Sequence, residues 1–362
     1  MSGSTAPVGF DSRDVIGGES GIGTGKLPSW APYGVAGASL ALVVAFLVLT
    51  GGFTLVKMVI GTAIVASAAI YMVSRAVESA RQAKDRLMTA TIASAFALAV
   101  LPLISLLYTV VDRGMARFDS TFFTESARNV VGAGGGAYHA IMGTLVVTGV
   151  ATVISVPIGI MAAIYLQEYG DGRRLARALT FFVDVMTGIP SIVAGLFSYA
   201  VFAIIFGPGI RLGIAGSVAL TVLMIPIVIR SAEEMLKIVP DHLREASYAL
   251  GTPKWRTIVK VVLPTAMAGM ITGVMLAVAR IIGETAPLLV TAGVIDSTNF
   301  NPFSGRMETL PVYAYFEYKT PGIPQDASYD RAWAAALTLI AIVLLLNLIA
   351  RLFYRRFGTE IR

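Results

Sequence analysis

The chain has 362 residues, of which 56% are hydrophobic and only 14% are charged, and its mean hydropathy is +0.76. About a quarter of the residues of a soluble domain are charged, so this composition indicates a membrane protein. The absence of cysteine excludes disulfides, thiolate metal sites and a cysteine nucleophile, and two histidines far apart in the sequence do not make a metal cluster.

The first 30 residues are polar, rich in Gly and Ser, and without the cleavage signature of a signal peptide. We expect residues 1–30 to form a disordered cytoplasmic tail. The tail contains GIGTGKL, but Ser20 stands where the first glycine of a phosphate loop belongs, and Leu27 replaces its Ser or Thr. The sequence therefore predicts that this chain binds no nucleotide, metal or other cofactor of its own.

Eight stretches are long and apolar enough for membrane-spanning helices of about 20 residues. They lie near residues 33–53, 55–74, 88–111, 138–166, 178–206, 213–230, 263–294 and 332–353. The seventh stretch is long enough for a tilted or broken helix. The fold class predicted is thus an all-α polytopic membrane protein with about eight transmembrane helices.

The distribution of Lys and Arg orients these helices, because cytoplasmic loops hold the excess of positive charge. Placing both termini in the cytoplasm assigns 19 of the 28 Lys and Arg residues to cytoplasmic segments and 8 to the opposite side, with Arg280 inside the membrane. Both termini are therefore expected in the cytoplasm. The basic excess reflects topology, so we expect no nucleic-acid partner.

The largest predicted cytoplasmic loop, residues 229–264, has the pattern of two short helices. Pro240 and Asp241 suit the first turn of a helix, and Gly251 supplies a left-handed stop. A second apolar stripe follows and includes Trp255. From these residues alone, the loop is an amphipathic hairpin at the membrane surface.

The same loop resembles the EAA loop of ABC-importer permeases, whose pattern is EAA, three residues, G, nine residues and I-x-L-P. The matching residues are Glu245-Ala246-Ser247, Gly251 and Val261-Val262-Leu263-Pro264. Serine replaces the third alanine of the pattern, and valine replaces its isoleucine.

This resemblance implies that residues 240–264 carry a coupling helix that docks on a separate ATPase subunit. Glu245 and Gly251 would form the docking contact and its turn, with Arg244 and Ala246 on the same element. ATP and magnesium are then expected on the ATPase and not on this chain.

Four further stretches resemble the permeases of phosphate-specific ABC importers, of the PstA type. They are KIVPDHLREASYALGTPKW, GVMLAVARIIGETAPLLVTAG, TGIPSIVAGLF and AAIYLQEYG. GETAPLL is the most specific of them, because the sister permease of these importers continues after GET with a different, Met-containing sequence. The resemblance covers residues 84–356, a six-helix permease domain, and leaves an extra helical pair at 31–80 and a cytoplasmic tail at 357–362.

The resemblance implies a multi-pass subunit of the bacterial plasma membrane that forms half of a path for inorganic phosphate. The expected partners are a homologous sister permease (PstC type), an ATPase dimer (PstB type), an extracytoplasmic phosphate-binding protein (PstS type) and the lipid bilayer.

Arg280 and Glu284 are two charges within the seventh apolar stretch, and each costs about 2.5 to 3.5 kcal/mol at mid-bilayer. On a continuous helix their spacing would place them on one face, where they could form a salt bridge that fastens this helix to a neighbour. Alternatively they line the substrate path, where a guanidinium suits phosphate. The residues leave both interpretations open.

Two helix breaks accompany these charges. Gly283 and Pro287 are expected to interrupt the helix around Thr285, and GIPS at 188–191 is expected to interrupt the fifth stretch. The freed amides and the Ser191 hydroxyl could donate to a phosphate oxygen, or the break could be a packing kink. The predicted substrate-path residues are Arg280, Glu284, Thr285 and Ser191.

Three other functions compete with phosphate import. The first is an ABC-importer permease for another oxyanion such as molybdate or sulfate, which the TAPLL stretch disfavours. The second is a secondary anion transporter working without an ATPase, for which the sequence offers no inverted repeat. The third is a membrane enzyme, for which no nucleophile and base or paired carboxylates stand out.

Overall fold

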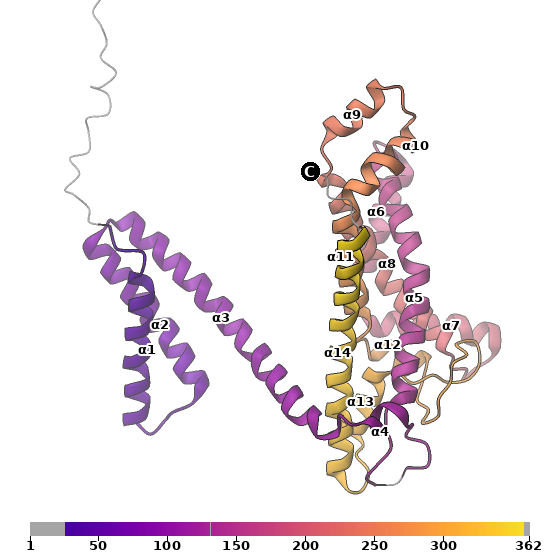
Figure 1. Cartoon of the computed structure of the whole chain (residues 1–362), viewed down its shortest axis with the longest axis horizontal. Coiled ribbons are helices and arrows are strands. Elements are labelled where there is room, and N and C mark those ends of the chain that lie inside the picture. Colours follow the sequence, from indigo (N-terminus) through magenta and orange to yellow (C-terminus); the bar gives the residue numbers. More distant parts are fainter. Residues whose placement is uncertain (1–25, 131, 358–362) are drawn as a thin grey trace, which may run out of the picture. The chain divides into compact units, whose positions relative to one another are not determined.

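The computed structural model describes residues 26–130 and 132–357, most of which fold into helices (Figure 1). This part of the chain contains no β-strand, which confirms the all-α prediction. The chain divides into two compact units, Met1–Leu107 and Tyr108–Arg362. Most of the predicted N-terminal tail and of the predicted C-terminal tail lies outside the described residues.

The first unit contains α1 (Ala31–Leu49), α2 (Leu55–Val77) and most of α3 (Ala80–Gly114), which continues into the second unit. Helices α1 and α2 lie against each other, joined by a short turn at Gly51. The φ of Gly51 is 65°, a conformation that costs glycine little. The predicted extra pair of helices is therefore a helical hairpin.

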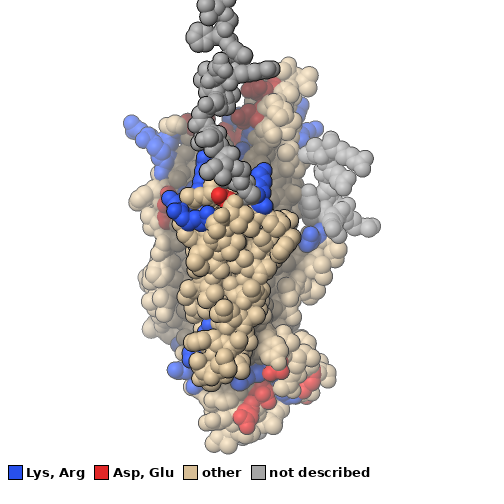
Figure 2. All heavy atoms as spheres, turned by 90° about the vertical axis from the view of Figure 1, so that its left-hand side faces the viewer, with Lys and Arg blue, Asp and Glu red and all other residues tan. Residues whose placement is uncertain are grey.

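Charged side chains are unevenly distributed along the first unit. Between Leu27 and Leu107 they are confined to Lys57 and to the segment 75–86. In Figure 2 the surface nearest the viewer is uncharged over most of its height, with Lys and Arg gathered near its upper end. An uncharged surface between charged ends fits helices surrounded by hydrocarbon.

Glu78 joins three segments of the first unit. Its carboxylate accepts hydrogen bonds from Nε and Nη2 of Arg86, both at 2.8 Å, from Oγ of Ser74 at 2.6 Å and from the backbone N–H of Leu27 at 2.9 Å. The bonds from Arg86, and next that from Ser74, lower the pKa of Glu78 to about 2. One carboxylate thus ties the segment before α1 to the end of α2 and the start of α3.

We expect acid to loosen the first unit through Glu78. A carboxyl with a lowered pKa stabilises the fold above its ordinary pKa of 4.5, and this stability is lost as the pH falls toward about 2. Thermal unfolding in detergent over this pH range should show a larger fall in Tm for the wild type than for Glu78→Gln, which has no charge to lose. The exposed Asp85 offers a control, since Asp85→Asn should keep the wild-type pH dependence. Identical profiles for wild type and Glu78→Gln would contradict the expectation.

The second unit contains the end of α3 and all the later helices. These are η1 (Met115–Arg117), α4 (Ser120–Thr124), α5 (Tyr138–Ile164), η2 (Tyr165–Tyr169), α6 (Arg174–Thr187), α7 (Ser191–Phe206), α8 (Gly213–Ile238), α9 (Asp241–Ala249), α10 (Lys254–Thr257), η3 (Ile258–Val262), α11 (Leu263–Ile281), α12 (Ala286–Thr291), α13 (Leu310–Lys319) and α14 (Gln325–Phe357). The segments η2 and η3 are π-helical, and they continue α5 and lead into α11.

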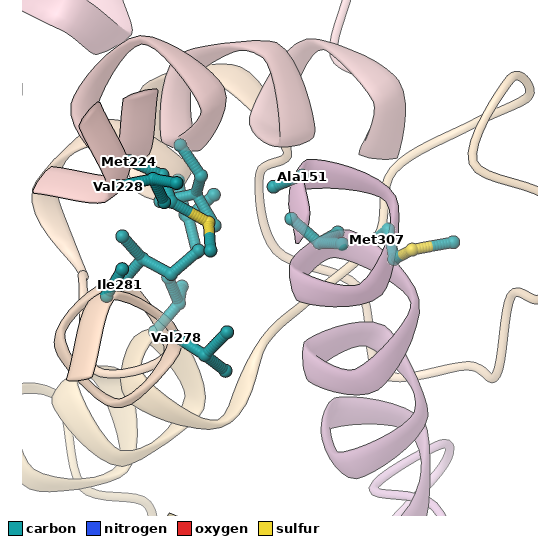
Figure 3. Close-up of a cluster of buried hydrophobic side chains, with 11 residues drawn as sticks. Ala151, Met224, Val228, Val278, Ile281 and Met307 are labelled. Atoms are coloured by element: carbon teal, nitrogen blue, oxygen red, sulfur yellow. The ribbon is translucent and has the colours of Figure 1, made fainter. Parts of the chain in front are cut away.

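Helix α8 is the central helix of the second unit, with α5 and α11 packed along it (Figure 1). Figure 3 shows part of the buried apolar cluster where the three helices meet, with Ala151 of α5, Met224 and Val228 of α8, and Val278 and Ile281 of α11. A helix that is apolar on every side is expected to be surrounded in this way. This group of three helices supports the sites described below.

Seven helices or continuous helix groups among the described residues are long and apolar enough to cross a membrane. An eighth crossing results if α6 and α7, which meet at a bend of 108°, form one span. The number of spans therefore agrees with the prediction, but two of the predicted spans are not continuous. The stretch 178–206 breaks at residues 188–190, and 263–294 breaks after Ile281, because Gly and Pro interrupt the helical ladder at both places.

Candidate functional site

The predicted hairpin at one end of the second unit consists of α9, a turn at Gly251 and α10. Gly251 has a φ of 73°, which confirms the left-handed stop. The hydroxyls of Ser247 and Thr257, both buried, lie 2.8 Å apart and connect the two arms. No loop separates α10 from α11, because η3 joins them directly. The α10 arm of the hairpin is therefore continuous with α11.

The outer surface of this hairpin is open. Glu245 and Ala246, which the sequence predicted at a docking contact, are exposed. Two large apolar side chains lie on the same element, with Leu250 86% exposed and Trp255 58% exposed. Exposed apolar side chains next to a charged one are typical of a surface that another protein covers.

Arg244 differs from the other predicted docking residues. Its side chain is only 13% exposed and turns toward the protein, where Nη2 lies 2.9 Å from Oε1 of Glu168. Sequence reasoning did not single out Glu168, which belongs to η2 and is separated from Arg244 by 76 positions. The signal available was a carboxylate at the end of an apolar stretch, a position that favours pairing with a cation.

Arg280 and Glu284 do not lie on one continuous helix. Helix α11 ends at Ile281, and Glu284 belongs to the break before α12, where its backbone N–H donates to the carbonyl of Ile281 at 3.1 Å. No ion pair joins Arg280 to Glu284 within the described part of the chain. Arg280 is exposed on the same side of α11 as Leu276, which is 64% exposed. The structure therefore leaves this guanidinium available to a partner outside the described chain.

The two predicted breaks lie next to each other. Helix α7 begins at Ser191 after its break, α12 begins at Ala286 after the other, and the two helices pack together. A Cβ at Gly195, one turn after Ser191, would lie 2.6 Å from the Cα of Pro287. Thr285 immediately precedes α12 and, like Ser191, is partly buried. The backbone amides that open each of these helices thus lie in neighbouring turns.

At the opposite end of α5, two titratable side chains are buried together. Nε2 of His139 lies 3.4 Å from Oε2 of Glu308, and burial raises the pKa of Glu308. Glu308 also lines a pocket of about 550 Å³, together with Tyr313 and Arg331. Sequence reasoning missed Glu308, because its partner is far away in the chain and no motif includes either residue.

No group of three or more His, Asp or Glu side chains among the described residues is arranged to hold a metal ion. The residues predicted for ATPase coupling lie on α9 and in the turn after it, whereas those predicted for the substrate path lie at the start of α7 and between the end of α11 and the start of α12. Helix α11 connects the two groups. This arrangement places a guanidinium near the end of α11 and brings the starts of α7 and α12 together beyond it in the chain.

Comparison with known proteins gives one family and a consistent set of relatives. The family described as binding-protein-dependent transport system inner membrane component matches residues 155–362. The phosphate transport system permease protein PstA 1 of Mycobacterium tuberculosis (strain CDC 1551) is 47% identical over 273 residues, which is 75% of this chain and 88% of that protein. PstA of Mycobacterium leprae is 46% identical over 287 residues, covering 78% of this chain and 92% of that protein. PstA of Yersinia pestis is 43% identical over 256 residues, covering 70% and 84%.

A solved structure supports the fold. The bacterial ABC transporter involved in the import of the acidic polysaccharide alginate has a chain that matches with a TM-score of 0.54 and 15% sequence identity, covering 76% of this chain and 97% of that chain. At this identity the match concerns the helical architecture alone.

Proposed function

Because the chain belongs to the binding-protein-dependent inner membrane components of transport systems, and among them to the PstA type of phosphate transport permease, we propose that it carries inorganic phosphate inward as one transmembrane subunit of an ATP-driven importer. It is a multi-pass protein of the bacterial inner membrane. In the proposed assembly it pairs with a homologous sister permease, rests on two ATPase subunits and receives phosphate from an extracytoplasmic binding protein.

The observation that carries this proposal is the position of Arg280 on the uncovered side of α11. A charged side chain facing hydrocarbon is costly, so this side of α11 has to face water or another subunit. A path between two permease subunits provides both. There the guanidinium can donate two parallel hydrogen bonds to phosphate, and Glu284 keeps its field weak enough for the anion to leave.

Coupling to ATP hydrolysis is proposed to use the exposed side of the hairpin. Glu245, Ala246 and Leu250 would lie in the contact with the ATPase, and the ATPase would bind the ATP and magnesium. Because η3 joins the hairpin to α11 without a loop, a pull on the hairpin would move the helix that carries Arg280. The breaks before α7 and α12 would then open the path alternately to the two sides of the membrane.

Copurification tests this proposal. Affinity purification of this chain from membranes in mild detergent should retain an ATPase subunit and a second permease. Gly251→Val should greatly reduce retention of the ATPase, because a β-branched residue cannot adopt the positive φ of this turn without strain. Gly51→Val introduces comparable strain in the α1–α2 turn and should leave the ATPase bound. An ATPase that is absent from the wild-type preparation, or retained fully by Gly251→Val, would contradict the proposed coupling.

A further inference from the structure

Glu168 holds the coupling hairpin against the end of α5. Its Oε1 accepts hydrogen bonds from Nε and Nη2 of Arg244, at 3.2 and 2.9 Å. The side chains of Glu168 and Arg244 are only 5% and 13% exposed, so little water competes for these bonds. Pairs of this kind are strong when both partners are present. Arg244 Nη1 also lies 3.1 Å from Oδ1 of Asp241, but that carboxylate is exposed, so Glu168 is the buried partner of the guanidinium.

Arg244 also connects the hairpin to the end of α8. Its Nη1 donates to the backbone carbonyl of Val239 at 2.7 Å, and Nη2 donates to that of Leu236 at 3.1 Å. The last carbonyls of a helix have no partner within the helix, so the guanidinium satisfies groups that α8 cannot satisfy itself. One side chain of α9 thus joins the ends of α5 and α8.

Lys254 adds a connection from the second arm of the hairpin. Its Nζ donates to the backbone carbonyl of Glu168 and lies 4.9 Å from the ring centre of Tyr169. The side chain of Glu168 is therefore bound by Arg244 of α9, and its backbone carbonyl is bound by Lys254 of α10. Both arms of the hairpin meet α5 at a single π-helical turn.

From this geometry we propose that Glu168 is a positioning residue that transmits movement of the coupling hairpin to α5. The inference rests on the proposed function, in which the ATPase moves the hairpin. Movement of the hairpin would then reach two helices, α11 through η3 and α5 through Glu168. Helix α5 runs from this contact to His139, which lies against Glu308 in the segment between α12 and α13. The cytoplasmic contact is thereby connected to the opposite end of the second unit.

The test is the number of phosphate ions imported per ATP hydrolysed, measured with the complete importer in proteoliposomes. Glu168→Gln keeps the size of the side chain but removes its charge, and it should lower this ratio by about tenfold, as expected for the loss of a buried charge-assisted bond. The KM for phosphate and the ATPase retained on purification should change little. The Tm of the complex should fall only modestly, because Arg244 keeps its bonds to Asp241 and to the carbonyls of Leu236 and Val239. Asp171→Asn removes an exposed carboxylate three positions away and should leave the ratio unchanged.

A reversible cross-link provides a second test that does not depend on one substitution. The chain contains no cysteine, so the pair Glu168→Cys and Arg244→Cys introduces the only two thiols in this subunit. The double variant should be uncoupled, a short bis-thiosulfonate cross-linker should restore coupling, and a reductant should abolish it again. Each single variant, treated in the same way, controls for thiols in the partner subunits.

An unchanged ratio in Glu168→Gln, or no recovery after cross-linking, would overturn this inference. Failure of the proposed function would look different, because the wild-type chain would then purify without an ATPase. If Glu168→Gln does not assemble, Lys254→Gln takes its place. It removes the bond to the Glu168 carbonyl and the contact with the Tyr169 ring but leaves the Glu168–Arg244 pair intact, so it should lower the ratio by a smaller factor.

Discussion

Arg280→Gln is expected to reduce phosphate uptake by about tenfold to a hundredfold while the importer still assembles. A charge-assisted hydrogen bond contributes about 1.5 to 3 kcal/mol, and glutamine can neither carry the charge nor make the paired bonds of a guanidinium. Uptake of labelled phosphate into cells that express the variant importer measures the effect. The ATPase activity of the purified complex should persist, because Arg280 lies outside the hairpin.

Two further variants separate the possible causes of a loss of phosphate uptake in Arg280→Gln. Arg280→Lys keeps the charge and loses the planar fork, so its uptake should lie between that of the wild type and that of Arg280→Gln. Arg128→Gln removes an exposed arginine from the loop before α5 and should leave uptake unchanged. Normal uptake by an intact complex with Arg280→Gln would exclude Arg280 from the substrate path. Loss of assembly would instead assign the residue to the contact between subunits.

Gly143→Ala is expected to destabilise the second unit strongly. A Cβ on Gly143 of α5 would lie 1.9 Å from the carbonyl oxygen of Glu308, and a backbone atom cannot move away as the end of a flexible side chain can. Overpacking of this kind costs about 1 to 3 kcal/mol or more. The expected result is a clear fall in the Tm of the purified chain, together with reduced accumulation in the membrane.

Gly149→Ala provides the matched control in the same helix. Nothing lies within 4 Å of the position of its Cβ, so the substitution adds no contact. Alanine favours a helix over glycine by about 1 kcal/mol, and the Tm should therefore stay the same or rise. Equal falls in Tm for both variants would show that α5 tolerates no added methyl anywhere and that the contact with Glu308 is not special.

The sequence predicted the features that depend on local chemistry. Gly283 and Pro287 predicted the break between α11 and α12, since neither residue supports a continuous helix there. The left-handed turn at Gly251 was predicted for a similar reason. Length and hydropathy likewise gave the number of membrane spans. Each of these signals is contained within a few neighbouring residues or one apolar stretch.

Features that depend on tertiary contacts could not be obtained in this way. The spacing of Arg280 and Glu284 suggested an ion pair only on the assumption of an unbroken helix. The motif predicted that Arg244 lies on the hairpin. It could not predict the direction of the side chain, which depends on Glu168 in a distant segment. Helix α13 was not predicted, because ten residues are too few for a membrane span and the segment has little amphipathic pattern.

The π-helical segment η3 changes how the surface of α11 is related to that of the hairpin. A π turn holds one residue more than an α turn, and each residue of an α-helix advances by about 100° around the axis. A single helical wheel drawn from Lys254 to Ile281 treats η3 as α-helical. If its residues after 262 are placed correctly, those before 258 appear rotated about the axis by roughly a quarter of a turn from their true positions. Cross-linking pairs or cysteine scans along this element should be designed on two separate wheels, one ending and one beginning at η3.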